Sequence, residues 1–192
     1  RDYVDVYFLH AVMADRYEEI RENAFPILER LKQKGKLRAI GITEMFGKDP
    51  GHVMLNRAVA EDLWDVIMIG MNVLNFSARP ILNRCVEKEI GVFDMFAVRR
   101  TLRNLETVSA RLIELTEQGL IDGEAVRRER PFSYALEIGE VGSVPEMAYR
   151  FCLHEPGMSV VLSGTSSLDH LRENKTSSEL GPLSAELRRR LE

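Results

Sequence analysis

The chain has 192 residues, of which 45% are hydrophobic and 29% are charged, an ordinary balance for a globular protein with one substantial core. Its formal net charge of −4 gives no electrostatic reason to expect nucleic acid or an anionic membrane surface as a partner. No apolar run approaches the ~20 residues of a membrane-spanning helix. We therefore expect neither a nucleic acid nor a membrane as a partner.

The first apolar run, Tyr3–Leu9, is short, β-branched and aromatic, and His10 follows it directly. This composition is typical of a strand buried on both faces of a parallel sheet. Similar runs follow helical stretches, most of them roughly thirty residues apart, which is the spacing of βα units. These runs are Lys36–Ile42, Asp65–Met71, Gly91–Phe96 and Met158–Ser163.

We therefore predict an α/β fold of the (β/α)8 TIM-barrel type, in which reactive side chains gather where the strands end. Five βα units are too few to close eight strands, and the chain begins at Arg1 without a Met or a visible signal peptide. Residues 1–192 are accordingly expected to form a single domain, a partial barrel whose N-terminal strands are missing.

The segments between the strands have apolar residues at helical spacing. The predicted helices are Glu22–Lys34, His52–Ala60, one that begins after Ser77, Asn104–Gln118, Val144–His154, one that contains His170, and Ala185–Leu191. Asn23, Ser77, Ser143 and Ser184 are the expected N-caps. Residues 119–142 are predicted to be an irregular connection with one short helix.

Cys85 and Cys152 both lie among apolar residues of predicted helices. We interpret them as buried free thiols of a protein in a reducing cytoplasm. The four histidines are scattered, and no Cys or His pair has the spacing of a zinc site, so no metal site is predicted.

Three groups of residues are candidates for chemistry. His10 ends a strand, where a neutral imidazole can donate a hydrogen bond to a substrate carbonyl, although the pattern by itself slightly favours a histidine satisfied by a backbone carbonyl. The run Ser163–Ser167 joins a strand to a helix, as a phosphate site does, but small polar residues also form ordinary turns. Arg99 and Arg100 can clamp a phosphate or carboxylate, or can lie in an exposed basic loop.

Three segments together resemble the aldo/keto reductase family. The run from Asp2 to His10 resembles the strand that ends in that family's active-site histidine. The segment Leu31–Thr43 is similar to the family's helix and strand around a Gly-Lys pair. The segment Val160–Thr165, followed by Leu171–Asn174, is similar to its cofactor-binding last strand and helix. The matches run in family order from residue 2 to residue 183.

The resemblance implies a barrel that transfers hydride between a nicotinamide dinucleotide and a carbonyl or alcohol. His10 would orient the substrate carbonyl and support proton transfer. The family's catalytic Tyr, Lys and Asp precede this histidine and have no counterpart in the sequence, so the 192-residue chain alone is expected to be inactive.

The resemblance also implies which residues hold the nicotinamide. Thr43 and Glu44 fall where the family has a Ser-Asn pair that binds the carboxamide, although the Glu44 carboxylate cannot donate. Met68 falls in place of a Gln that contacts the same amide, and Met95 in place of a stacking aromatic ring. Phe96 can supply that ring from the next position, and Arg99 can supply charge to the pyrophosphate.

At the adenosine end, the implied cofactor contacts lie after the last predicted strand. Gly164 and Thr165 match the phosphate loop, and Glu173 and Asn174 match the pair that contacts adenine. His170 takes the place of an Arg that grips the 2′-phosphate. The resemblance favours NADP(H) over NAD(H).

The predicted function is that of an NAD(P)(H)-dependent oxidoreductase, acting in the cytoplasm on a small carbonyl compound, alcohol or sugar. A nucleotide-binding regulatory or sensor barrel with little turnover is the alternative, which the replacements at Met68 and Met95 support. An unrelated barrel enzyme acting on a sugar phosphate is a third interpretation. The expected geometry places His10, Thr43, Met95 and Gly164 at the carboxyl edge of one parallel sheet; the oligomeric state stays open.

Overall fold

A computed structural model describes residues 2–192, which form two compact units. The first unit comprises the residues up to Met71 together with Asn75–Met95 and Pro156–Val160. The second comprises Asn72–Leu74, Phe96–Glu155 and Val161–Glu192. Among the described residues, no helix is both long and apolar enough to cross a membrane.

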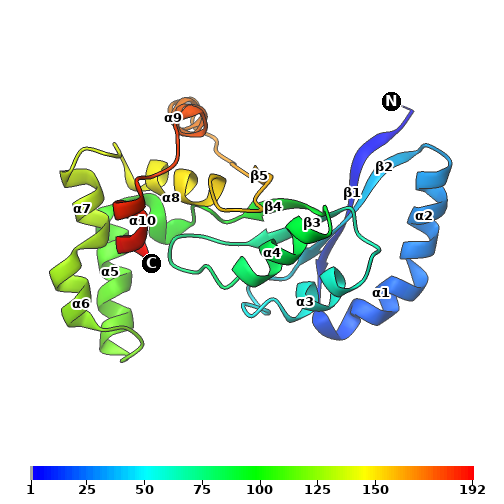
Figure 1. The fold of residues 1–192 in the computed structure, drawn as a ribbon, viewed down its shortest axis with the longest axis horizontal. Coiled ribbons are helices and arrows are strands. Elements are labelled where there is room, and N and C mark those ends of the chain that lie inside the picture. The colour runs from blue at the N-terminus through cyan, green and yellow to red at the C-terminus, as the bar shows by residue number, and fades with distance from the viewer. Residues whose placement is uncertain (1) are drawn as a thin grey trace. The chain divides into compact units, whose positions relative to one another are not determined.

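The strands of the first unit follow one another side by side in chain order, with the short β5 next to β4 (Figure 1). Their bounds are β1 (Val4–Val12), β2 (Leu37–Glu44), β3 (Val66–Gly70), β4 (Gly91–Met95) and β5 (Val160–Val161). The pairs β1/β2, β2/β3 and β3/β4 are all parallel. The predicted α/β fold is therefore confirmed, and the sheet is that of a partial (β/α)8 barrel. The last strand is shorter than the predicted Met158–Ser163.

Helices separate the strands of the first unit: η1 (Ala14–Arg16), α1 (Tyr17–Asn23), α2 (Phe25–Gln33), α3 (Val53–Ala60) and α4 (Arg79–Glu87). The prediction of one helix over Glu22–Lys34 was wrong, because α1 and α2 are separate helices that meet at Ala24. Pro26 stands at the start of α2, where its missing N–H costs nothing. Asn23 ends α1 rather than capping a helix, and Ala78, not Ser77, precedes α4.

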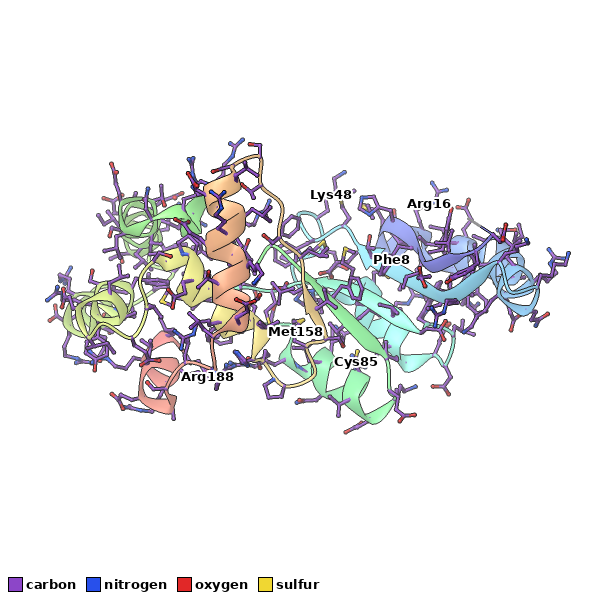
Figure 2. All side chains as sticks on the ribbon, turned by 90° about the horizontal axis from the view of Figure 1, so that it is seen from above. Phe8, Arg16, Lys48, Cys85, Met158 and Arg188 are labelled. Carbon is purple, nitrogen blue, oxygen red and sulfur yellow. The ribbon has the colours of Figure 1, made fainter. Side chains whose placement is uncertain are left out.

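The two faces of this sheet have different side chains. Ile42, Ile67 and Val92 stand opposite one another in the strand register and are fully buried. On the other face, the rings of Phe8 and Phe93 lie 5.5 Å apart; Figure 2 labels Phe8 on its strand. The helices α2 and α3 contact β2, and α4 contacts β4. The sheet thus has one helix-covered face and one face that carries the aromatic rings.

The second unit is helical: η2 (Arg100–Arg103), α5 (Leu105–Glu117), α6 (Gly123–Glu129), α7 (Pro131–Glu137), α8 (Val144–Leu153), α9 (Leu168–Glu179) and α10 (Ala185–Leu191). The prediction for residues 119–142 was wrong, since the segment forms the two helices α6 and α7. Pro131 begins α7 and makes the break between them. Ser143 and Ser184 accept backbone N–H groups as the predicted N-caps.

Cys85 on α4 and Cys152 on α8 are both buried, and neither forms a disulfide bond; Figure 2 labels Cys85. Burial raises the pKa of the Cys85 thiol to about 11, so this thiol is protonated at neutral pH. A protonated, buried thiol is a poor nucleophile and metal ligand. Among the described residues, no group of His, Cys, Asp and Glu has the arrangement of a metal site.

Candidate functional site

His10 and Thr43 lie at the carboxyl ends of the neighbouring strands β1 and β2. The Thr43 Oγ1 is 3.1 Å from the His10 Nδ1, and it accepts the Ala11 backbone N–H at 2.6 Å. His10 is exposed, whereas Thr43 is only 1% exposed. Parallel pairing brings both strand ends to one edge of the sheet. An exposed imidazole is thus supported from behind by a buried hydroxyl group.

Met68 and Met95 lie on the same face of the sheet as Thr43. Thr43 is opposite Met68 in the register, and Met68 is opposite Phe93. Met95 lies two residues further along β4, so its side chain points to the face that Phe93 occupies. Both methionines are half-buried. The first unit therefore gathers His10, Thr43 and two thioethers on one face, near the ends of the strands.

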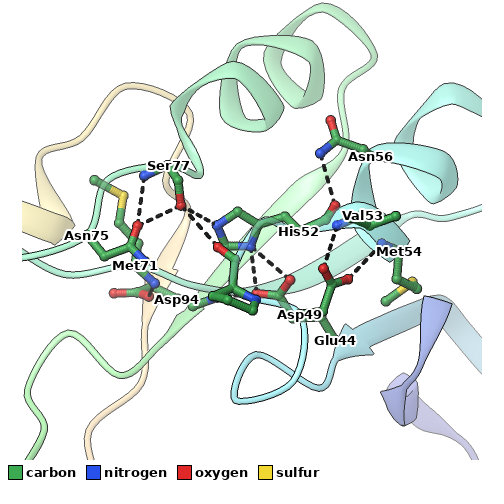
Figure 3. Close-up of polar contacts among 12 residues, drawn as sticks. Glu44, Asp49, His52, Val53, Met54, Asn56, Met71, Asn75, Ser77 and Asp94 are labelled. Atoms are coloured by element: carbon green, nitrogen blue, oxygen red, sulfur yellow. Dashed lines mark hydrogen bonds and ion pairs between the residues drawn. The ribbon is translucent and has the colours of Figure 1, made fainter.

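Glu44, the next residue on β2, is buried, and its carboxylate contacts other polar groups (Figure 3). Its two carboxylate oxygens lie 2.8 and 3.0 Å from the His52 Nδ1, and one of them accepts the Gly70 N–H at 2.8 Å. Burial raises the pKa of the Glu44 carboxyl, and the bonds from His52 and Gly70 oppose that rise. A cofactor contact by Glu44 stays a prediction, and it would have to share oxygens that are already bonded.

The hydrogen bonds of Ser77 place a proton on the His52 Nε2. The Asn75 Oδ1 accepts the Ser77 N–H at 3.0 Å and lies 2.6 Å from the Ser77 Oγ (Figure 3). The single hydroxyl proton therefore goes to Asn75, and the His52 Nε2, 2.9 Å from the same Oγ, must donate. A nitrogen that donates cannot also accept the proton of a nucleophile. This Glu-His-Ser arrangement is thus not that of a serine hydrolase.

In the second unit, Phe96 and Arg99 contact each other. The Arg99 guanidinium carbon lies 4.2 Å from the centre of the Phe96 ring, a cation–π contact. Phe96 has a φ of 81°, in the left-handed region that a bulky residue rarely adopts. The ring is 36% exposed. The pair presents an aromatic face and a cation from one short segment directly after β4.

The loop before α9 contains the predicted phosphate site. Gly164 and Thr165 are both exposed, and a Cβ placed on Gly164 would meet nothing within 4 Å. The Thr165 Oγ1 accepts the Ser167 N–H at 3.1 Å, and Ser167 caps α9 by accepting the His170 N–H at 3.3 Å. The loop is therefore open and begins a helix of twelve residues. His170 and Glu173 are exposed on that helix.

A cavity of about 280 Å³ lies beside Asn174, which was predicted to contact adenine. The Asn174 Nδ2 donates to the Ser163 Oγ at 2.7 Å. The residues that line the cavity come from α8, from the segment at β5 and from α9: Tyr149, Leu153, Val161, Ser163, Leu171, Asn174, Lys175 and Ser178. Apolar walls with a few amide, hydroxyl and ammonium groups are suited to a planar heterocycle.

The contacts of His52 and Ser77 were not predicted from the sequence. His52 was predicted only as the start of a helix, and Ser77 only as a cap. His52 has a φ of 56°, a left-handed backbone conformation that is uncommon outside glycine, and its side chain is buried at 1% exposure. The one available signal was a Pro50-Gly51 turn that can return the chain to the strand end at Glu44, and turns of this kind are common.

Comparisons with known proteins agree with one another. The whole chain, residues 1–192, matches the sequence model of the Aldo/keto reductase family. It is 27% identical over 181 residues to L-galactose dehydrogenase from Arabidopsis thaliana, covering 90% of this chain and 52% of that protein. The holo form of aldo-keto reductase AKR11C1 from Bacillus halodurans superposes with a TM-score of 0.71 and 21% identity. The match covers 99% of this chain and 60% of that one.

A second solved structure is similar: the thermostable aldo-keto reductase Tm1743 in complex with the inhibitor epalrestat. Its TM-score is 0.66 at 18% identity, over 99% of this chain and 59% of that one. At these identities the solved structures support the fold alone. The chain spans about half the length of the curated relative and about three-fifths of the solved structures.

Proposed function

The chain belongs to the aldo/keto reductase family, and we propose that the whole protein is an NAD(P)(H)-dependent oxidoreductase. Its substrate would be a small carbonyl compound, alcohol or sugar. The observation that carries this proposal is the contact between the exposed His10 and the buried Thr43 at two adjacent parallel strand ends. Membership of the family also excludes the interpretation as an unrelated barrel enzyme acting on a sugar phosphate.

A nicotinamide dinucleotide fits part of the predicted contact set. The Thr43 oxygen has a single bonded donor, the Ala11 N–H, and so keeps one lone pair, but at 1% exposure this lone pair is not open to a carboxamide N–H. Gly164 leaves open space for a phosphate, and the cavity beside Asn174 accepts a flat ring. Phe96 and Arg99 add an aromatic face and a cation. When bound, the cofactor would supply the hydride.

NADP(H) is proposed ahead of NAD(H). His170 and Arg172 stand exposed in the first turns of α9, and a 2′-phosphate needs cationic or donor groups of this kind. Arg172 forms an ion pair with Asp169 at 2.9 Å, so its charge is less available to bind a phosphate. The proposal for the phosphate therefore rests on His170.

His10 would hold the substrate carbonyl as a hydrogen-bond donor, which lowers the energy of the negative charge that develops on the oxygen. We propose that the proton-donating groups lie outside these 192 residues, in the remaining part of a complete barrel. The five strands of the chain, and its match to 52–60% of the length of its relatives, support this division. A cytoplasmic location belongs to the same proposal.

A binding titration beside a steady-state assay tests the function. The whole protein should bind NADPH more tightly than NADH, as followed by cofactor fluorescence, and should turn over a small aldehyde with saturation. Replacing His10→Gln should lower kcat about 100-fold or more, because a positioned acid–base group contributes that much, while NADPH still binds. The 192-residue chain alone should show no turnover. Turnover by that chain, or full activity of the His10→Gln protein, contradicts the proposal.

The second candidate is a cofactor-sensing barrel with little turnover. Its support is that neither Met68 nor Met95 can donate a hydrogen bond or offer an aromatic face. NADPH binding with negligible turnover on any carbonyl substrate would favour the sensor. Saturable turnover would favour the enzyme.

A further inference from the structure

We propose that Thr43 is a positioning residue that selects the tautomer of His10, keeping the ring proton on Nε2. The proposal rests on the function proposed above, since it concerns the residue expected to hold the substrate. It assigns to the Thr43 hydroxyl a role in addition to any contact with the cofactor. Three neighbouring groups determine the tautomer: the His10 ring, the Ala11 N–H and the Thr43 hydroxyl.

The backbone of β1 is irregular at this point. Its register with β2 is regular from Val4 to Leu9 and then shifts before Val12. Two residues of β1, His10 and Ala11, therefore lie opposite the single residue Thr43 of β2. Ala11 has a φ of 55°, in the left-handed region that only glycine adopts without strain. Bulges of this kind redirect a side chain and leave an N–H without its strand partner. The Thr43 Oγ1 accepts that N–H at 2.6 Å.

The hydroxyl proton of Thr43 then has one destination. Thr43 is 1% exposed, so water cannot accept the proton, and a buried hydroxyl without an acceptor is costly. Across residues 2–192, the hydroxyl oxygen contacts two partners, the Ala11 N–H and the His10 Nδ1 at 3.1 Å. The Ala11 group can only donate, so the Thr43 proton goes to Nδ1. A neutral imidazole that accepts at Nδ1 carries its proton at Nε2.

This tautomer suits an exposed histidine that must bind a carbonyl oxygen. The oxygen of a carbonyl only accepts, so an imidazole with its proton on Nδ1 would meet the substrate with a lone pair. With the proton on Nε2, the exposed ring of His10 offers a donor. Orientation of a histidine through its second nitrogen is a general device of metal and catalytic sites.

Nitrogen NMR reads the tautomer without substrate or cofactor. The whole protein is labelled with ¹⁵N-histidine and measured at alkaline pH, where the ring is neutral, and His10→Gln identifies the signals. The wild type and Thr43→Ser should show a protonated Nε2 and an unprotonated Nδ1. Thr43→Val keeps the shape but loses the hydroxyl, so its two nitrogen shifts should move toward one another. The three other histidines of the chain, His52, His154 and His170, are internal controls.

Two results of the NMR measurement would overturn the proposal: a proton on Nδ1 in the wild type, or nitrogen shifts in Thr43→Val that match the wild type. If Thr43→Val does not fold, the wild type and Thr43→Ser still test the proposal, because both retain the hydroxyl and a proton on Nδ1 in either would overturn it.

The tautomer and the function can fail separately. A protein that shows the Nε2 tautomer but no turnover keeps this assignment and loses the proposed activity. In an active protein, Thr43→Val should lower kcat about tenfold or more, and Thr43→Ser should retain most of it. A Thr43→Val protein whose defect is confined to NADPH affinity would assign Thr43 to the cofactor alone and overturn the positioning role.

Discussion

Thr43 and Glu44 illustrate how two neighbouring side chains at one strand end acquire different roles. Successive residues of a strand point to opposite faces, so Thr43 supports His10 while Glu44 meets His52 and Gly70. The bonds of Ser77 require a proton on the His52 Nε2. Burial of the Glu44 carboxyl raises its pKa, so the folded chain retains this proton to a higher pH than the unfolded chain does.

This retention predicts a pH dependence of stability. Burial raises the pKa of Glu44 above its unfolded value, so the contribution of the group is complete at low pH and is lost as the pH rises through the folded pKa. His52, Asp49 and the Gly70 N–H are the groups that act on this carboxyl. Glu44→Gln should flatten the fall in the free energy of unfolding, whose slope for one proton is at most about 1.4 kcal/mol per pH unit.

Chemical denaturation of the whole protein, repeated from acidic to neutral pH, measures this slope. Glu87→Gln, an exposed substitution on α4, is the matched control and should leave the slope unchanged. A Glu44→Gln protein with the slope of the wild type would show that Glu44 is not the group responsible.

At the scale of the strand, the contact between β1 and β2 depends on a glycine. Gly41 stands opposite Phe8, and a Cβ built on it would lie 2.4 Å from two carbons of the Phe8 ring. The ring in turn contacts Phe93 at 5.5 Å between centres. The glycine thus makes room for an aromatic ring on the sheet face that His10 and Thr43 share.

Gly41→Ala should therefore destabilise the protein by about 1–3 kcal/mol, the usual cost of overpacking. Gly47→Ala, whose added Cβ would meet nothing within 4 Å, should change stability by no more than about 0.5 kcal/mol. Combining Gly41→Ala with Phe8→Leu should recover part of the loss, because the two residues are in contact. Additive effects of the two substitutions, measured by urea unfolding, would contradict the clash.

The helices show which local sequence signals are sufficient to predict a helix N-cap. Ser143 and Ser184 were predicted as caps and cap α8 and α10, because the residue type and its position before an apolar periodic run specify that bond. The N-terminus of α3 was not predictable in this way. Asp49, several residues before the helix, accepts the N–H groups of Val53 and Met54 at 2.9 and 2.8 Å. Only the path of the loop brings that carboxylate back.

At the scale of the molecule, β1 and β5 end the sheet among the described residues. β1 and the residue before it carry apolar side chains that are about half exposed: Tyr3 at 47%, Val4 at 48% and Tyr7 at 45%. An exposed apolar edge strand is a template for pairing with another chain. In a complete barrel, a neighbouring strand would cover this edge.

We therefore expect the isolated 192-residue chain to self-associate. Sedimentation velocity over a range of concentrations should show species larger than the 21.9 kDa monomer, and Tyr7→Lys should shift the distribution toward monomer, because a charge on the edge opposes pairing. Lys substitution at the exposed Val86 on α4 is a control away from the edge. A monomer at all concentrations, with cooperative unfolding, would contradict this expectation.

The order of strands, their parallel pairing and the positions of His10 and Thr43 at strand ends were determined by the sequence alone. The physical reason is that these features depend on local composition, on βα spacing and on where each apolar run stops. The bulge at Ala11, the proton on the His52 Nε2 and the fit of Phe8 over Gly41 were decided only by the tertiary structure. Each of these arises between groups separated by 25 to 33 residues in the chain, and the geometry of such contacts is set by packing, which the spacing of residue types does not encode.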